Sequence, residues 1–413
     1  MSGNPSQTDP NAPSGGSAST PRPTIARRSN RTGIYVAVAV VIIVILVVLV
    51  GAAAGWFTAK KSTAAAGSCP TAVTLDGNGA NFILPLVTSW AASYQSSTSN
   101  LVSYDPAGAG AGITALTDKL VDFAATDEPL NTTQYNSLPG TILTLPITGG
   151  ALAVVLNIPG VTSHINLTGP IIAEIYLGQI TTWNATPIQS INPGVSLPSS
   201  SIVPVVRSDA AGTTFVLTNF LSEDSSTWAT GPGTGIQVSW PKVANELAVK
   251  GNSLLAKTVS TTSNTIGYVD LTDTLNTVGL NYAKVENPAG TFVLPTVNDT
   301  ASAIANASAT IHFPAITSNW ANVSLVNAPG AGSYPLATFS YFLVYKAVDI
   351  GYSPSQSKAQ VIVQWLNWVV TTGQTFASGL NYVPVPSALL SLDQAALGNM
   401  TFDGSAIPGC TTG

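Results

Sequence analysis

An arginine and an aspartate stand close together in the stretch VVRSDAAGTTF, residues 205–215. Arg207 is the only arginine that follows Arg31, in a chain with 8% charged residues against roughly 25% in an ordinary soluble protein. A guanidinium is well shaped for bidentate contact with a tetrahedral oxyanion. Because Arg207 ends a predicted strand, where ligands bind in open α/β sheets, it is a candidate anion-binding residue. The alternative is a surface arginine or a structural ion pair with Asp209.

Asp127, in the stretch VDFAATDEPL, is a second candidate. An acidic residue beside a bound anion repels it unless the anion carries a proton and donates a hydrogen bond to the carboxylate. Phosphate carries such a proton at neutral or acidic pH, and sulfate does not. A buried carboxylate that faces an unprotonated oxyanion lacks a partner, which selects strongly against that ligand. The alternative role for Asp127 is a helix cap or a turn residue.

Three turns of small residues, GNGANF, GAGAGI and RSDAAG, each follow a predicted strand and precede a predicted amphipathic helix. The helix after the first turn has Phe82, Leu86 and Trp90 on one face, and the helix after the second has Ile113, Leu116 and Leu120. Helix N-termini present unpaired N–H groups and the positive end of the helix dipole, which bind anions. Glycine lets the backbone approach a ligand closely. Three such ends in one cleft would bind an oxyanion without a metal.

Motifs of other chemistries are missing from the sequence. There is no G-x-S-x-G, H-E-x-x-H or G-x-x-x-x-G-K-[ST] pattern, and His164 and His312 lack a metal-ligand spacing. We therefore predict no catalytic residue, no metal site and no cofactor, and a protein that is not an enzyme. No nucleic-acid partner is expected.

The part of the chain after Ala72 alternates short apolar runs with helical patterns, which is typical of an α/β fold. It is too long for one ordinary hydrophobic core, so two domains are expected.

The N-terminal part predicts a membrane anchor. Residues 1–33 are rich in Pro, Gly, Ser and Thr and are predicted to be a disordered cytoplasmic tail, and residues 34–57 a transmembrane helix. The residues that set its orientation are Arg22, Arg27, Arg28 and Arg31 before the helix and Lys60 and Lys61 after it, and they place the N-terminus in the cytoplasm. Residues 58–69 are a tether. A cleaved signal peptide with TAAAGS as its cleavage region is the competing interpretation.

The predicted extracellular part contains two cysteines and several glycosylation sequons. Cys69 and Cys410 lie at its two ends, which favours a disulfide in an oxidising environment over two free thiols. The candidate N-glycosylation sites are Asn131, Asn166, Asn298, Asn306, Asn322 and Asn399. Pro187 disfavours a further sequon at Asn184.

An ordered set of segments between about Val73 and Leu390 resembles the phosphate-binding proteins of ABC-type phosphate transporters. The segments are LDGNGANFILPLVTSWAASY, VDFAATDEPL, IYLGQITTWN, VVRSDAAGTTFVLTNFL, TGIQVSWP, TIGYVDLTD and WLNWVVTTGQ. The resemblance implies a two-domain periplasmic-binding-protein fold of type II with two hinge crossovers, near ALAVVLN and YPLATFS. We expect residues 70–152 and 335–413 in the first domain and residues 153–334 in the second.

The same resemblance implies the ligand-binding residues. The positions that match are Asn81, Phe82, Ala109, Asp127, Arg207, Ala211, Gly212 and Thr213, with Asp209 bracing the arginine. Three of these positions depart from the family pattern. Asn81 stands where the family has a threonine, and Ala109 and Ala211 stand where it has serines.

The function implied is capture of inorganic phosphate, or a related protonated oxyanion, by an extracellular membrane-anchored protein that delivers it to an ABC permease. The alternative is a cell-surface sensory or structural module that kept the fold and binds another anion or binds weakly. The substitutions at Ala109 and Ala211 support that alternative.

Overall fold

The computed structural model describes residues 68–410. The chain divides into two units, residues 1–63 and 64–413, and the described residues all belong to the second. The predicted cytoplasmic tail, transmembrane helix and most of the tether lie outside the described residues. Within residues 68–410, no helix combines the length and the apolar character that a membrane span requires.

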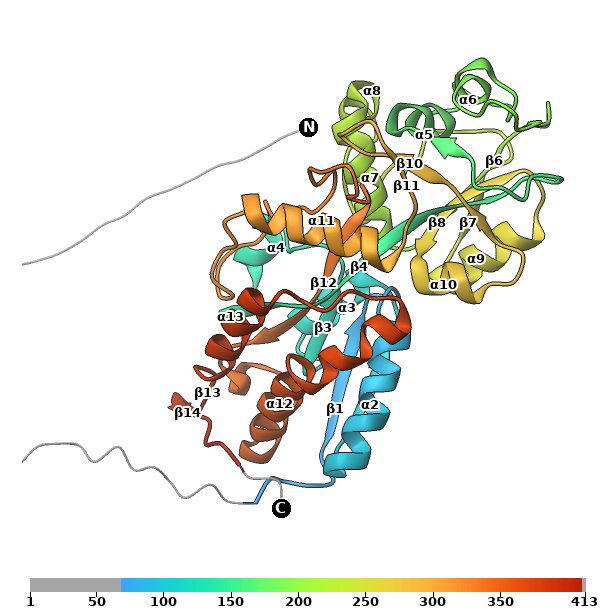
Figure 1. The fold of residues 1–413 in the computed structure, drawn as a ribbon. Helices are drawn as coiled ribbons and strands as arrows, with labels where there is room; N and C mark the ends of the chain where they lie inside the picture. Colours follow the sequence, from blue (N-terminus) through green and yellow to red (C-terminus); the bar gives the residue numbers. More distant parts are fainter. Residues whose placement is uncertain (1–67, 411–413) are drawn as a thin grey trace, which may run out of the picture. The chain divides into compact units, whose positions relative to one another are not determined.

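A mixed sheet of nine strands organises the described part (Figure 1). Its order is β2 (Leu101–Asp105), β1 (Thr74–Gly79), β3 (Phe123–Thr126), β12 (Ala337–Tyr345), β4 (Ile142–Asn157), β8 (Thr265–Asp270), β6 (Val203–Arg207) and β7 (Leu247–Val249), with β9 (Asn281–Tyr282) beside β4. β2, β1 and β3 are parallel, and so are β8, β6 and β7. The antiparallel strands β12 and β4 join these two parallel sets.

Two small sheets complete the strands. They are β11 (Phe292–Val293), β10 (Lys284–Glu286) and β5 (Asn166–Leu167) in one, and β13 (Thr401–Phe402) and β14 (Ser405–Ala406) in the other.

The helices follow the strands in the order that the alternating pattern predicts. They are α2 (Leu84–Thr98), α3 (Ala109–Thr117), α4 (Thr132–Ser137), α5 (Gly169–Tyr176), α6 (Thr186–Ser190), α7 (Gly212–Asp224), α8 (Ser226–Thr230), α9 (Asn252–Thr261), α10 (Leu271–Asn276), α11 (Val297–Thr310), α12 (Gln356–Val369) and α13 (Ser387–Leu397). Short 3₁₀ turns are η1 (Val348–Ile350), η2 (Thr372–Phe376) and η3 (Ser378–Leu380).

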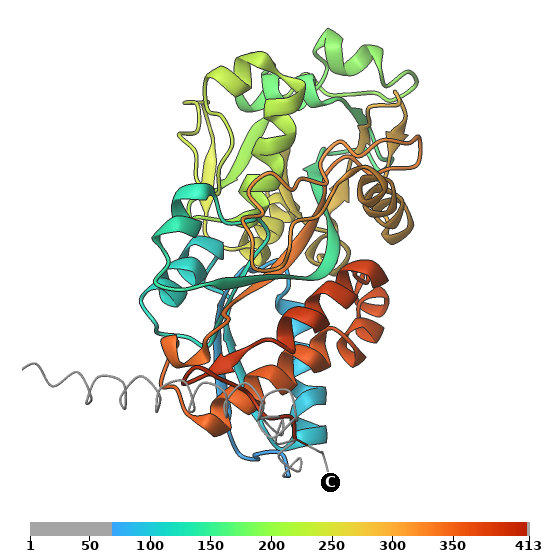
Figure 2. The ribbon, with the colours of Figure 1, turned by 90° about the vertical axis from the view of Figure 1, so that its left-hand side faces the viewer.

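The long strand β4 passes from one hydrophobic core to the other (Figures 1 and 2). Up to Ala151 it pairs with β12, and from Leu152 it pairs with β8. Leu143, Leu145 and Ile147 of β4 belong to the first core, and its apolar residues from Ala151 to Leu156 belong to the second. Where the chain returns, Leu336 still packs in the second core and Ala337, at the start of β12, packs in the first. Both changes lie in the two stretches expected to be hinge crossovers.

Residues 303–328 pack differently from the predicted division of domains. Ala303, Ile304 and Ala307 of α11 are buried in the first core, although the sequence suggested the second domain for them. The physical reason is the close contact of α11 with β4, since the Ile304 side chain fills the space beside Gly149. We refer to the parts around the first and second cores as lobe I and lobe II.

The structure tests the predicted apolar faces of two helices and the predicted pairing of the two cysteines. Phe82, Leu86 and Trp90 are buried together in the first core. The prediction that Leu120 continues the apolar face of α3 is wrong, because α3 ends at Thr117 and Leu120 is 60% exposed. Cys69 and Cys410, whose pairing the sequence predicted, form a disulfide with Cα atoms 4.8 Å apart.

Buried carboxyls predict an unusual dependence of stability on pH. Asp393 of α13 is fully buried, neither of its carboxyl oxygens has a partner among the described residues, and burial raises its pKa to about 9. A raised pKa in the folded state stabilises the fold below the ordinary value near pH 4, and this stabilisation is lost as the pH rises through 9. Asp393→Asn stays neutral at every pH and lacks this loss.

We expect the free energy of unfolding to fall more steeply from pH 5 to pH 9 in the parent than in Asp393→Asn. The difference in slope should approach about 1.4 kcal/mol per pH unit. Urea titrations at both pH values measure it, and parallel pH profiles of the two proteins would contradict the account of Asp393.

Candidate functional site

Arg207 is buried at the end of β6, with 3% of its surface exposed. A guanidinium has five N–H donors, and here all five are engaged. Nε donates to Asp209 Oδ1 at 2.7 Å, and Nη2 pairs with the second oxygen of Asp209. Nη1 donates to Thr213 Oγ1 at 3.2 Å and to Asn252 Oδ1. The other Nη2 hydrogen donates to Asn81 Oδ1 at 2.9 Å, so a lobe I residue contacts the arginine of lobe II.

Further polar groups hold Arg207 and its hydrogen-bond partners in place. Asn252 Nδ2 donates to Asp270 Oδ2 at 2.8 Å, so the amide connects a buried carboxyl to the guanidinium. The Arg207 backbone N–H donates to Tyr268 Oη at 3.0 Å. The Asp209 carboxylate also accepts from the Gly251 N–H at 3.3 Å. Burial acts to raise the pKa of this carboxyl, but the hydrogen bonds and charge of Arg207, with the Gly251 N–H, together outweigh burial and lower the pKa. Arg207 is thus oriented from several sides.

Asn252, Tyr268 and Asp270 were not identified as candidates from the sequence. A signal for Asn252 existed, since the stretch LAVKGNS is a strand, a glycine and a helix start, the same arrangement as the three turns singled out above. No local pattern distinguishes Asp270, which caps α10 by accepting from the Asp273 N–H.

Asp127 follows β3 and is 1% exposed. Its Oδ1 accepts a hydrogen bond from Ser340 Oγ at 2.6 Å. Burial raises the pKa of this carboxyl to about 7, and the Ser340 hydrogen bond and the charge of Arg207 oppose the rise. The neighbouring Glu128 carboxyl has a pKa raised to about 8 by burial and by Asp127. Asp127 therefore changes protonation near neutral pH, within the electrostatic influence of Arg207.

The start of α7 comes very close to Asp127. A Cβ atom at Gly212 would lie 2.5 Å from Asp127 Oδ2, so the position accepts only glycine without a shift. The N–H groups of Gly212 and Thr213 are in the first turn of α7 and have no partner inside the helix. This end of α7 therefore brings backbone donors, Asp127 and Arg207 into one place.

Four helices begin at this place without a side-chain cap. Their N-cap residues are Ile83, Gly108, Ala211 and Gly251 for α2, α3, α7 and α9. Side chains cap α4, α5, α8, α10, α11 and α12, and two further helices away from this place, α6 and α13, also begin without a side-chain cap. Uncapped N-termini keep backbone donors available for an anion.

The two alanine positions also lie where the lobes meet. Ala109 starts α3, and the next residue, Gly110, donates its N–H to the Ala210 carbonyl at 3.3 Å. The Ala211 N–H donates to the Ile236 carbonyl at 2.9 Å, so that donor is already used. Phe82 lies just before α2, and its carbonyl accepts a hydrogen bond from Tyr382 Oη at 2.6 Å. The residues that the resemblance implied thus lie near one another in the structure.

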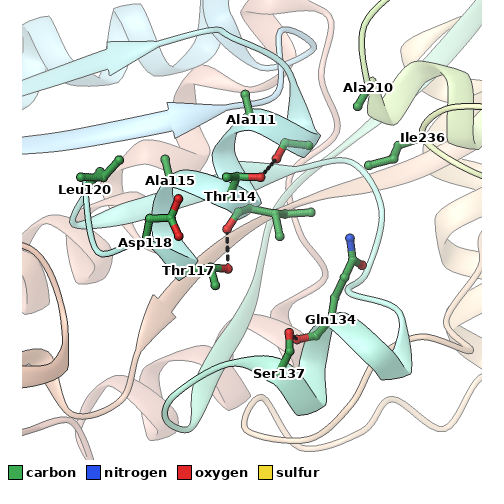
Figure 3. A pocket seen from close by; sticks show the side chains of 12 residues that line it. Ala111, Thr114, Ala115, Thr117, Asp118, Leu120, Gln134, Ser137, Ala210 and Ile236 are labelled. Atoms are coloured by element: carbon green, nitrogen blue, oxygen red, sulfur yellow. Dashed lines mark hydrogen bonds between the residues drawn. The ribbon is translucent and has the colours of Figure 1, made fainter. Parts of the chain in front are cut away.

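A surface pocket of about 700 Å³ lies beside this cluster (Figure 3). Its wall is mainly apolar, from α3 and α4 with Ala210 and Ile236 across from them. Asp118 is its one charged lining residue, which disfavours an anion there. In residues 68–410 no group of three or more His, Cys, Asp or Glu side chains is arranged to bind a metal ion.

Comparisons with known proteins identify the family of this chain. A family model described as the PBP superfamily domain matches residues 64–372. The phosphate-binding protein PstS of Xylella fastidiosa is 33% identical over 329 residues, which cover 78% of this chain and 84% of that protein. PstS of Pasteurella multocida is 33% identical over 330 residues (78% and 90%), and PstS of Methanocaldococcus jannaschii is 32% identical over 314 residues (74% and 80%).

Solved structures show the same fold at lower identity. A high-affinity periplasmic phosphate-binding protein, PfluDING, solved with bound phosphate, superposes with a TM-score of 0.62 at 19% identity over 78% of this chain and 93% of its own. The phosphate-binding protein from Stenotrophomonas maltophilia gives 0.60 at 20% identity over 79% and 94%. The resemblance predicted from the sequence is confirmed: the chain belongs to the PBP superfamily and, within it, to the family of the phosphate-binding proteins PstS.

Proposed function

We propose that this protein captures inorganic phosphate between lobes I and II and delivers it to an ABC permease. The observation that carries the proposal is the position of Asp127 and Arg207, two buried and oppositely charged side chains, beside the uncapped start of α7. The guanidinium and the backbone N–H groups neutralise an oxyanion, and the carboxylate accepts the proton that phosphate carries. The relatives' name, phosphate-binding protein, supports the choice of phosphate.

The proposed binding residues are the positions that the resemblance implied. They are Asn81, Phe82, Ala109, Asp127, Arg207, Ala211, Gly212 and Thr213, with Asp209 holding the arginine. Side-chain hydroxyls are missing at Asn81, Ala109 and Ala211. At about 0.5–1.5 kcal/mol per neutral hydrogen bond, their loss weakens binding roughly 10- to 1,000-fold unless other groups compensate.

The setting of the site is also a proposal. We infer an extracellular binding unit, held at the membrane by the helix at residues 34–57 with a cytoplasmic N-terminus. Its two ligand-binding domains correspond to residues 70–152 with 335–413 and to residues 153–334, with 303–328 packing against the first. The role is binding and delivery rather than catalysis.

Glycans are proposed at the exposed sequons, which are Asn131, Asn298, Asn306, Asn322 and Asn399. Asn166 is half-buried and its side-chain amide donates to the Ile191 carbonyl at 3.0 Å, which disfavours its modification.

Calorimetric titration of the purified full-length protein in detergent, with phosphate, arsenate and sulfate at several pH values, tests the proposal. We expect phosphate and arsenate to bind and sulfate to be excluded at pH 8. Absence of phosphate binding at every pH would refute phosphate capture.

A second candidate is a cell-surface sensory or structural module with weak anion binding. Ala109 and Ala211, which offer no hydroxyl, and the complete engagement of the Arg207 donors favour it. Phosphate affinity too weak for calorimetry in the parent, together with unchanged phosphate uptake after deletion of the gene, would favour this candidate over transport.

A further inference from the structure

Asn81 fastens the two lobes to each other through its side-chain amide. Its Nδ2 donates to the Pro106 carbonyl within lobe I, and its Oδ1 accepts from Arg207 Nη2 of lobe II at 2.9 Å. The first bond fixes the orientation of the amide, so that the carbonyl oxygen is presented to the guanidinium. Asn81 itself is half-buried, where water competes little for these contacts.

The Arg207–Asn81 bond is the one contact of the guanidinium that crosses between the lobes. The other four donors go to Asp209, Thr213 and Asn252, which all belong to lobe II. An anion that binds Arg207 must take donors that these groups engage. Nη2 has two acceptors, the charged Asp209 carboxylate, which the Gly251 N–H also holds, and the neutral Asn81 amide oxygen, so an anion that reaches Nη2 displaces Asn81 more easily than Asp209.

We propose that Asn81 is a latch that competes with the anion for Arg207 and holds the lobes together without it. The inference rests on the proposed function, because it assigns to the amide the position that an oxyanion takes beside Nη2. It replaces the ligand-binding role that the resemblance implies, and that is proposed above, for the Asn81 side chain. A residue that only bound the ligand would strengthen binding, whereas a latch that stabilises the unliganded closed form weakens it.

The consequence for affinity has a definite sign. A hydrogen bond to a charged donor that is present only in the unliganded closed form lowers the apparent affinity by up to about 10- to 100-fold. Asn81→Ala is therefore expected to bind phosphate up to about 10- to 100-fold more tightly than the parent. Asn81→Thr, which restores a hydroxyl able to donate to an anion, is expected to bind at least as tightly as Asn81→Ala.

Closure without ligand is the second readout and does not depend on phosphate binding. Spin labels at Ser96→Cys in lobe I and Thr230→Cys in lobe II, both exposed, report the distance between the lobes by pulsed electron resonance. In phosphate-free buffer we expect the full-length parent to populate the short distance, and Asn81→Ala and Asn81→Thr to shift toward a longer one.

Asn78→Ala is the matched control, because Asn78 lies near the end of β1, three residues before Asn81, and its Nδ2 donates to Asp105 inside lobe I. It is expected to leave the distance distribution unchanged. If Asn81→Ala and Asn81→Thr remain as closed as the parent, the latch is wrong. If they open but bind phosphate more weakly, Asn81 is a ligand-binding group and the competition is wrong. If no protein binds phosphate, the proposed function fails, and the distance measurement alone decides on the latch.

Discussion

Replacing Arg207 with alanine is expected to weaken phosphate binding by about 10²- to 10⁴-fold. This range corresponds to two hydrogen bonds to a charged group at about 1.5–3 kcal/mol each. The substitution also leaves Asp209 and Asp127 in a buried site without their cation, and both then repel an anion. Calorimetric titration of the variant with phosphate measures the loss.

The controls for this prediction separate charge from geometry. Arg207→Lys keeps the positive charge but not the planar fork, so an intermediate loss is expected. Lys257→Ala removes an exposed cation from α9 and should leave affinity unchanged. An affinity of Arg207→Ala equal to that of the parent, with an unchanged melting temperature, would show that Arg207 does not bind the anion.

Replacing Asp127 with asparagine is expected to reduce the preference for phosphate over sulfate by about 100-fold or more. The Asp127 carboxylate can only accept a hydrogen bond, and sulfate has no proton to donate to it, so the two repel each other. The amide N–H of Asp127→Asn can instead donate a hydrogen bond to sulfate. The larger effect is therefore a gain of sulfate binding. Parallel titrations with both anions at pH 8 measure it.

The pH dependence gives this prediction a second test. Because burial raises the pKa of Asp127 to about 7, the carboxyl gains its proton as the pH falls through 7 and can then donate to sulfate. Sulfate binding by the parent should strengthen from pH 8 to pH 5.5, while that of Asp127→Asn should change little. Glu128→Gln, at the adjacent buried carboxyl, is the control and should keep the exclusion of sulfate at pH 8. Sulfate exclusion that persists in Asp127→Asn would overturn the role of Asp127.

Much of the site could be predicted from the sequence because its parts are local. Arg207, Asp209 and Gly212 lie within six residues, at a strand end and the helix start that follows it, and the chain itself sets their spacing. The ordered segments then identified the family, and with it the position of Asn81, whereas Asp127 was a candidate from its own chemistry. The alternation of apolar runs likewise predicted the α/β class, and the resemblance to the family implied the stretches where β4 and β12 change cores.

The rest depended on contacts between distant parts of the chain. Ser340 reaches Asp127 from 213 residues away, and Asn252 connects Asp270 to Arg207, because strands far apart in sequence end at the same place. No local pattern reports such a meeting. The same reason explains α11, whose apolar face is visible in the sequence, whereas the lobe that buries it is not.

The sequence alone therefore determined which side chains are available to bind an anion and which turns present them. Only the tertiary structure decided how they are used. It brought the Asn81 carbonyl oxygen of lobe I to Arg207 of lobe II and thereby engaged the last donor of the guanidinium. Hydrogen-bond partners are set by packing in three dimensions, and an amide that donates and accepts equally well reveals its role only when its neighbours are known.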